Sequence, residues 1–117
     1  MGFLRFDFLT LFVDNLDEAR DFYQKLGLEC SVNNKNFVML ASADGDRLAF
    51  HQTRPGVAAS TGIDLHFMVN NLDEYVFRLT NNFPDKKLTI TESKWKGRLL
   101  KLRDPQGNSV ELVEQSK

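Results

Sequence analysis

One histidine and two carboxylates are the chain's clearest candidates for proton-transfer chemistry. His66 follows Asp64 by two residues in a segment with strand-like alternation, and alternate residues of a strand share one face. An imidazole beside a carboxylate can move a proton if burial raises the pKa of the carboxylate towards neutrality. Glu111 is the second carboxylate that could serve His66 in this way. The alternative role of these side chains is a hydrogen-bonded ion pair in a binding pocket.

Other familiar catalytic patterns are missing from the sequence. It has no glycine-rich phosphate loop, no nucleophile elbow around Ser42 or Ser60, and no Cys-x-x-Cys motif. Nucleotide hydrolysis and acyl transfer are therefore disfavoured. The single cysteine, Cys30, cannot form an internal disulfide. We interpret it as an ordinary strand residue, because nothing around it in the sequence would lower its pKa.

The elements that would position these residues occur twice. Residues 13–18 read VDNLDE, and residues 69–74 read VNNLDE. In each copy the asparagine before the leucine can cap a helix, and the glutamate three residues later can complete a capping box. Apolar stripes at helical spacing follow, from Leu16 to Leu26 and from Leu72 to Phe83. The repeat therefore predicts two equivalent strand-to-helix junctions.

Each half of the chain is expected to have the order βαβββ. A length of 117 residues with 42% hydrophobic content can bury one adequate core but is too short for two independent domains. We therefore predict a single domain made of a first module (about 1–54), a linker (about 55–62) and a second module (about 63–117). The expected strands span residues 6–13, 29–32, 37–40 and 47–52 in the first module, and 64–69, 88–93, 98–103 and 108–113 in the second.

Charge and hydropathy exclude several classes of partner. The net charge of -1 and pI near 6.1 give no overall attraction for nucleic acid or an anionic membrane. No apolar run approaches the roughly 20 residues that cross a bilayer, and the N-terminus lacks the apolar segment of a signal peptide. We expect a soluble, cytoplasmic protein that binds neither nucleic acid nor membrane.

Two longer motifs make the chain similar to a known superfamily. Residues 13–28 read VDNLDEARDFYQKLGL, and residues 103–112 read RDPQGNSVEL. Together with the two βαβββ halves, they resemble the glyoxalase, bleomycin-resistance and extradiol-dioxygenase superfamily, also called vicinal oxygen chelate. The resemblance implies an α+β fold in which two modules form a cupped mixed sheet, with helices on the convex side and a pocket on the concave side. It also implies a homodimer, because many members are dimers.

Metal-dependent members of this superfamily take ligands from the first and last strands of each module. Matching the motifs residue by residue places Phe8 and Ala49 at these positions in the first module, and Asp64 and Glu111 in the second. A phenyl ring and a methyl group cannot coordinate a metal. Two carboxylates alone suit the borderline metals poorly, because these metals favour nitrogen donors as well. The resemblance therefore predicts a member with no cofactor and without the usual metal centre.

A displaced metal centre is the alternative. Strand alternation puts His51 on the face of Ala49, and His66 on the face of Asp64. The protein would then be a metal-dependent lyase, isomerase or dioxygenase. The ligand set for zinc, nickel, manganese or iron would be His51, Asp64, His66 and Glu111.

A cup that binds without reacting needs an apolar lining with a few polar groups. Trp95 stands just before the penultimate strand, where antibiotic-sequestering relatives often carry a tryptophan. It could stack on a planar or cationic ligand, or cover the open end of the shell. We predict a small-molecule-binding protein that takes an aromatic or amphipathic ligand, with antibiotic resistance as a candidate role and an interaction module as a further alternative. The predicted ligand-binding residues are Phe8, Phe12, Arg47, His51, Asp64, His66, Met68, Trp95, Leu99, Lys101, Arg103 and Glu111.

Overall fold

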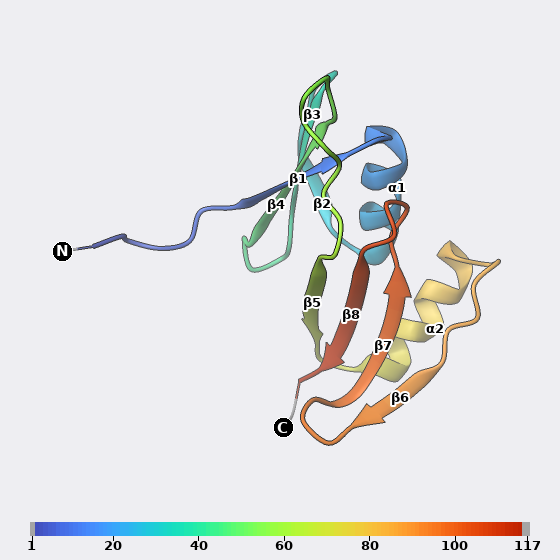
Figure 1. The fold of residues 1–117 in the computed structure, drawn as a ribbon. Helices are drawn as coiled ribbons and strands as arrows, with labels where there is room; N and C mark the ends of the chain where they lie inside the picture. The colour runs from blue at the N-terminus through green and yellow to red at the C-terminus, as the bar shows by residue number, and fades with distance from the viewer. Residues whose placement is uncertain (1, 116–117) are drawn as a thin grey trace. The chain divides into compact units, whose positions relative to one another are not determined.

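The computed structural model describes residues 2–115, which form two compact units joined between Ser60 and Thr61. Each unit contains one helix and a four-stranded mixed sheet in the order βαβββ (Figure 1). The predicted α+β class with two modules is confirmed. Neither helix in the described part of the chain is long and apolar enough to cross a membrane.

The first unit has the sheet order β1-β4-β3-β2. Its first and last strands, β1 and β4, pair in parallel, and the remaining pairs are antiparallel. The elements are β1 (Leu9–Val13), α1 (Leu16–Leu26), β2 (Glu29–Asn33), β3 (Phe37–Ala41) and β4 (Arg47–Gln52).

The second unit repeats this topology with the order β5-β8-β7-β6. Here β5 and β8 are the parallel pair, and the remaining pairs are antiparallel. The elements are β5 (Asp64–Val69), α2 (Leu72–Asn82), β6 (Ile90–Ser93), β7 (Gly97–Arg103) and β8 (Ser109–Glu114).

The two helices begin in the same way, as the repeated motif predicts. The side chain of Asn15 accepts a hydrogen bond from the Glu18 amide at 3.0 Å, and Asn71 accepts one from the Glu74 amide at 3.1 Å. Both caps satisfy a helix N–H group that has no partner within the helix. The helices end differently, because α1 stops at Gly27 with φ 121° whereas α2 stops at Phe83 without a glycine.

The last strand of each sheet also holds the start of its helix. In the first unit, Gln52 accepts from the Leu16 amide at 3.1 Å and donates to the Asp14 carbonyl at 2.5 Å. In the second unit, Glu114 accepts from the Leu72 amide at 2.9 Å. Gln52 and Glu114 are equivalent, since each pairs with the valine that ends the first strand of its unit. A side chain from the last strand therefore fixes where each helix leaves the sheet.

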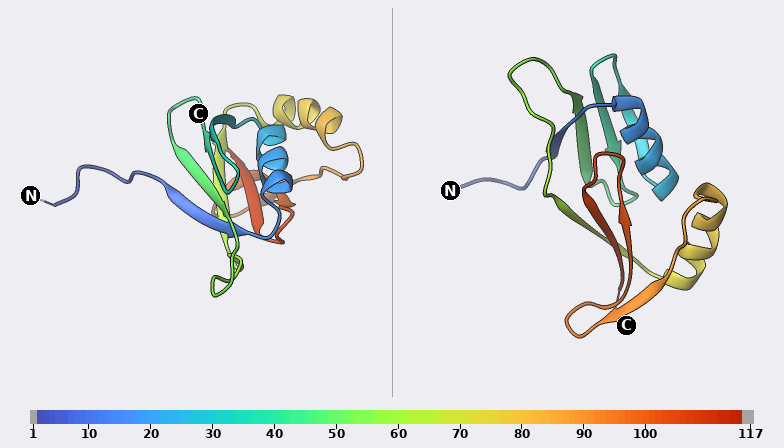
Figure 2. Two further views of the ribbon diagram at one scale, coloured as in Figure 1. Left: turned by 90° about the horizontal axis from the view of Figure 1, so that it is seen from above. Right: turned by 45° about the vertical axis from the view of Figure 1, so that its right-hand side comes forward.

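Each helix covers one face of its own sheet (Figure 2). In the first unit, α1 packs on β2, β3 and β4, and its Tyr23 ring lies fully buried 4.9 Å from the ring of Phe50. In the second unit, α2 packs on β7 and β8, with Leu72 and Leu79 as its buried residues. The opposite face of each sheet carries no helix of its own unit, and we call it the open face.

The first strand is shorter than predicted. It begins at Leu9 rather than Phe6, because its partner β4 starts at Arg47, after the turn over residues 42–46. Residues 2–8 therefore have no strand to pair with and run as an extended segment (Figure 1). Phe3 and Phe6 are 90% and 73% exposed, and Asp7 is ion-paired with Arg47. The sixth strand also begins later than expected, at Ile90.

Candidate functional site

The open face of the second unit carries most of the predicted site residues. Strand register aligns them in three rows across β5, β8 and β7. The middle row contains His66, Glu111 and Lys101, and it lies between a polar row and an apolar row. The polar row is Asp64, Ser109 and Arg103, and the apolar row is Met68, Val113 and Leu99.

Glu111 is the centre of a small charged cluster. Its side chain is only 10% exposed, and its Oε1 lies 2.9 Å from the Lys96 Nζ and 3.4 Å from the His66 Nδ1. Lys96 comes from the turn between β6 and β7, so the cluster joins three separate segments of the second unit. One carboxylate oxygen thus faces two nitrogen groups.

The protonation state of Glu111 follows from these contacts. The hydrogen bond from Lys96 lowers the pKa of Glu111 below its ordinary value, and it outweighs the loss of solvation, which acts in the opposite direction. The charges of Lys96, His66 and Lys101 lower this pKa further. Glu111 is therefore an anion at neutral pH. Proton transfer by Glu111 would require a pKa raised by burial, and the structure shows the opposite shift in this pKa, because Lys96 supplies a counter-charge.

The polar row is less tightly connected. Asp64 is exposed on the edge strand β5, and no hydrogen bond or ion pair of its side chain is found within residues 2–115. Arg103 donates to the Gly107 carbonyl at 3.0 Å. The Ser109 Oγ is buried and has no hydrogen-bond partner among the described residues. Of the two carboxylates predicted to serve His66, only Glu111 contacts it.

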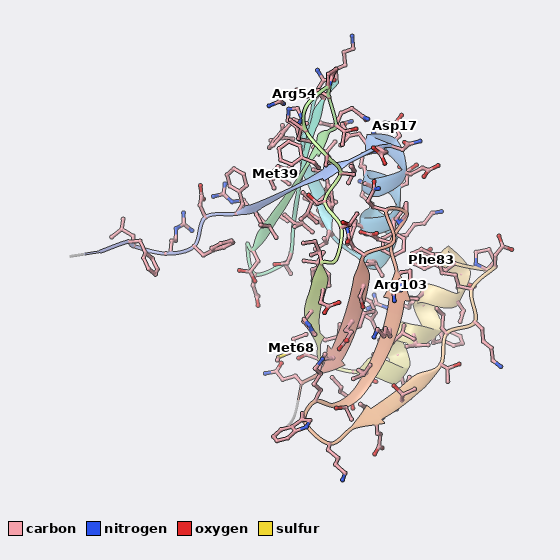
Figure 3. All side chains as sticks on the ribbon, in the orientation of Figure 1. Asp17, Met39, Arg54, Met68, Phe83 and Arg103 are labelled. Carbon is pink, nitrogen blue, oxygen red and sulfur yellow. The ribbon has the colours of Figure 1, made fainter. Side chains whose placement is uncertain are left out.

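The apolar row and the adjoining turn expose hydrophobic surface. Met68 is 68% exposed and projects away from α2 (Figure 3), whereas Leu99 is buried. Trp95, in the turn next to Lys96, is 95% exposed. The indole is therefore open to solvent in the described structure, and its two suggested roles, stacking on a ligand and covering the open end of the shell, stay predictions.

The open face of the first unit has a different character. His51 lies between two phenylalanines, with ring centroids 5.6 Å from Phe12 and 6.4 Å from Phe37. Its Nδ1 lies 2.8 Å from the Gln52 carbonyl oxygen, so this contact involves Nδ1 and not Nε2. Phe37 was not among the predicted site residues, although its alternation with Met39 along β3 is a signal that could have placed it there.

Phe8 and Arg47 lie together at the other end of the first sheet. The Arg47 guanidinium sits over the Phe8 ring, 5.7 Å from its centroid, which is within the range of a cation–π contact. Phe8 precedes β1, so it is outside the strand in which a metal ligand was expected.

Cys30 is half-buried in β2, and its Sγ lies 3.3 Å from the Val32 carbonyl oxygen.

The usual metal-ligand positions do not fit a metal ion. In the first unit these positions are the phenyl ring of Phe8 and the methyl group of Ala49. Ala49 pairs with Thr10 on β1. In the second unit the Glu111 carboxylate is already bound by an ammonium group. No group of three or more His, Cys, Asp or Glu side chains that could hold a metal ion is found within residues 2–115. The displaced centre draws His51 from one unit and its other three ligands from the other, and it stays a prediction.

Comparisons with known proteins agree with this architecture. The solved structures include a bleomycin-binding protein in complex with bleomycin, at 18% identity and TM-score 0.72, covering 96% of this chain and 99% of that one. A bleomycin resistance determinant encoded on transposon Tn5 is 18% identical with TM-score 0.74, covering 97% and 99%. Lactoylglutathione lyase from Agrobacterium tumefaciens is 19% identical with TM-score 0.71, covering 97% and 96%. At these identities the likeness concerns the fold alone.

The sequence itself carries the family assignment. No curated protein matches the chain. The sequence profile of the Glyoxalase/Bleomycin resistance protein/Dioxygenase superfamily, however, matches residues 5–112, which is nearly the whole chain. The protein therefore belongs to this superfamily.

Proposed function

We propose that this protein binds an aromatic or amphipathic small molecule on its open faces, without the usual metal centre of its superfamily. One observation carries the proposal: on the second unit, exposed Met68 adjoins a charged row that contains the ionised Glu111. Binding sites for small molecules typically combine apolar area with a few directional polar groups. This face offers both within adjacent rows of one sheet.

The arrangement suits a ligand with distinct apolar and polar ends. The apolar end would cover Met68 and the neighbouring Val113, and the polar end would meet His66 and Lys101. Each square ångström of apolar surface removed from water stabilises a complex by about 25 cal/mol. Stacking on Trp95, which is 95% exposed, would add about 0.5–1.5 kcal/mol beyond its area.

Relatives of the same fold support this class of ligand. One of the similar structures is a bleomycin-binding protein with bleomycin bound, and another is a bleomycin resistance determinant. We therefore propose antibiotic sequestration as the role to test first. We also propose a cytoplasmic homodimer, and light scattering of the purified protein would show whether its mass is twice 13.4 kDa.

Binding can be tested with N-phenyl-1-naphthylamine, a neutral aromatic probe that fluoresces when it leaves water. We expect saturable binding, and a loss of affinity of about five- to tenfold in Met68→Ala, because this change removes exposed contact area. Phe77→Ala is the matched control, since Phe77 is 74% exposed but lies on α2. Absence of saturable binding, or equal losses in the two variants, would contradict the proposal.

The single tryptophan gives a second readout. Trp95 is the only tryptophan in the chain, so its emission reports on the turn between β6 and β7. We expect the probe to quench this emission over the same concentration range in which it binds. Bleomycin itself should then be titrated in the same way. A response to the probe but not to bleomycin would reject the sequestration of bleomycin and leave the proposal of small-molecule binding in place.

A further inference from the structure

We propose that Lys96 is a built-in counter-ion that keeps divalent cations away from the Glu111–His66 pair. Glu111 occupies the position of a metal ligand in metal-dependent members of the superfamily, and here the Lys96 Nζ lies 2.9 Å from its Oε1. The chain thus sets its own ammonium group against the carboxylate that stands at this ligand position. On this proposal the second unit does not merely lack metal ligands, because Lys96 also opposes metal binding at Glu111.

The burial of Glu111 explains why a counter-ion is needed. Its side chain is 10% exposed, and a carboxylate removed from water is costly unless a cation or hydrogen bonds compensate it. His66 lies 3.4 Å from the same oxygen, but it carries a charge only when it is protonated. The Lys96 ammonium group makes the shorter contact, at 2.9 Å, so we assign Lys96 as the counter-ion of Glu111.

The turn between β6 and β7 presents Lys96 for this contact. Ser93 pairs with Gly97 at the ends of the two strands, and Gly97 has φ 74°, a conformation that favours glycine. The Trp95 amide lies 3.2 Å from the Ser93 Oγ, to which it donates. Lys94 belongs to the same turn, but no ion pair of its side chain is found in the described part of the chain. The contact with Glu111 therefore depends on the position of Lys96 in the turn, and not on the presence of lysines in the turn.

The first unit offers an internal contrast. At the positions of His66 and Glu111 it has Thr10 and Ala49, which pair in register on β1 and β4. Neither residue carries a charge, so no counter-ion is required there. Among these four residues only Glu111 is a carboxylate, and it is the one that a lysine from a turn contacts.

Lys96→Gln tests the proposal, with Lys94→Gln as the matched control. Nickel(II) chloride is the probe, because nickel accepts imidazole and carboxylate ligands and its paramagnetism broadens the NMR signals of nearby imidazoles. We expect Lys96→Gln to strengthen nickel association at His66 by tenfold or more, since removing an adjacent positive charge removes repulsion of a dication. The wild type and Lys94→Gln should bind nickel equally weakly.

Two further variants locate the effect. Adding His66→Asn or Glu111→Gln to Lys96→Gln should abolish the gain. Circular dichroism establishes that each variant is folded, and Lys96→Met replaces Lys96→Gln if the latter is not. The proposal is overturned if Lys96→Gln binds nickel no better than the wild type, or if Lys94→Gln gains as much affinity as Lys96→Gln.

Discussion

The two units of this protein share a scaffold but differ in what their open faces carry. Both have a capping asparagine, a parallel pair of first and last strands, and a side chain from the last strand on the helix start. On the open faces, the pair Thr10 and Ala49 of the first unit stands against His66 and Glu111 of the second. The internal repeat therefore persists where the backbone depends on it and is lost on the open faces, where we propose that a ligand binds.

The cores of the units differ as well. Helix α1 buries five residues, including Phe22 and Leu26, whereas α2 buries only Leu72 and Leu79. The equivalents of Phe22 and Leu26 in α2 are Arg78 and Asn82, whose polar groups need water or hydrogen-bond partners. We expect the first unit to depend more strongly on its helix than the second.

Truncating equivalent helix residues should give the largest effect. Tyr23→Ala removes a fully buried ring that contacts Phe22 and Phe50, and we expect the free energy of unfolding to fall by about 3–5 kcal/mol. Leu79→Ala, at the equivalent position of α2, should cost about 1 kcal/mol less. Urea unfolding followed by circular dichroism measures both values. A larger loss for Leu79→Ala would reverse the expected order.

Truncating the side chain that joins the last strand to the helix start should lower the free energy of unfolding of the two units by different amounts. This effect should be smaller than that of the buried helix residues. Glu114 binds both the Leu72 amide and Arg98, so Glu114→Ala should lower the free energy of unfolding by about 1.5–3 kcal/mol. The neutral Gln52→Ala should cost about 0.5–1.5 kcal/mol. Glu114→Gln places the side chain of the first unit in the second, and we expect it to restore part of the loss. No recovery in that variant would mean that the ion pair with Arg98 provides the whole effect.

The helix caps should not distinguish the units at all. Asn15 and Asn71 have nearly identical backbone angles, with φ of -131° and -129°. We expect Asn15→Ala and Asn71→Ala each to lower the free energy of unfolding by about 1 kcal/mol. Thermal unfolding of the two variants in parallel checks this equality. A clear difference would show that packing around the cap, and not the cap itself, sets its contribution.

The smallest expected effect concerns acid. Because folding lowers the pKa of Glu111 below about 4.5, the stability that its ionised form contributes is present above that pH and is lost as the pH falls through the lower, folded value. In Glu111→Gln the melting temperature should therefore fall less steeply at acid pH. Its dependence on pH near neutrality should be unchanged. The first unit has Ala49 at this position, so Ala49→Ser provides a control. An unchanged acid limb in Glu111→Gln would contradict the assigned pKa direction.

The fold could be predicted because it depends on local, repeated patterns. Asn15 and Asn71 announced the helix starts, and alternation along Asp64–Val69 gave a strand with the observed bounds. The start of β1 was misplaced, because the alternation over Phe6–Phe8 lies before the point at which its parallel partner β4 begins. A strand needs a partner, and the sequence of one strand does not reveal the length of another.

The site was harder to predict for a related reason. His66 and Glu111 were paired correctly, because register follows from the repeated topology. Lys96 was not expected to be the partner of Glu111, since a long side chain in a turn has many reachable positions. Its contact inverts the expected pKa shift of Glu111. A charge brought in from a turn thus changes the chemistry that the strand residues alone led us to expect.

The parallel pairing of β1 with β4 has a consequence for synthesis. Every strand of the first sheet lies between Leu9 and Gln52, so the ribosome has released all of them before the second unit has fully emerged. Folding during translation proceeds from the N-terminus, and each strand of this sheet pairs with strands that end at or before Gln52. The second unit, which holds the charged site, is completed after the first.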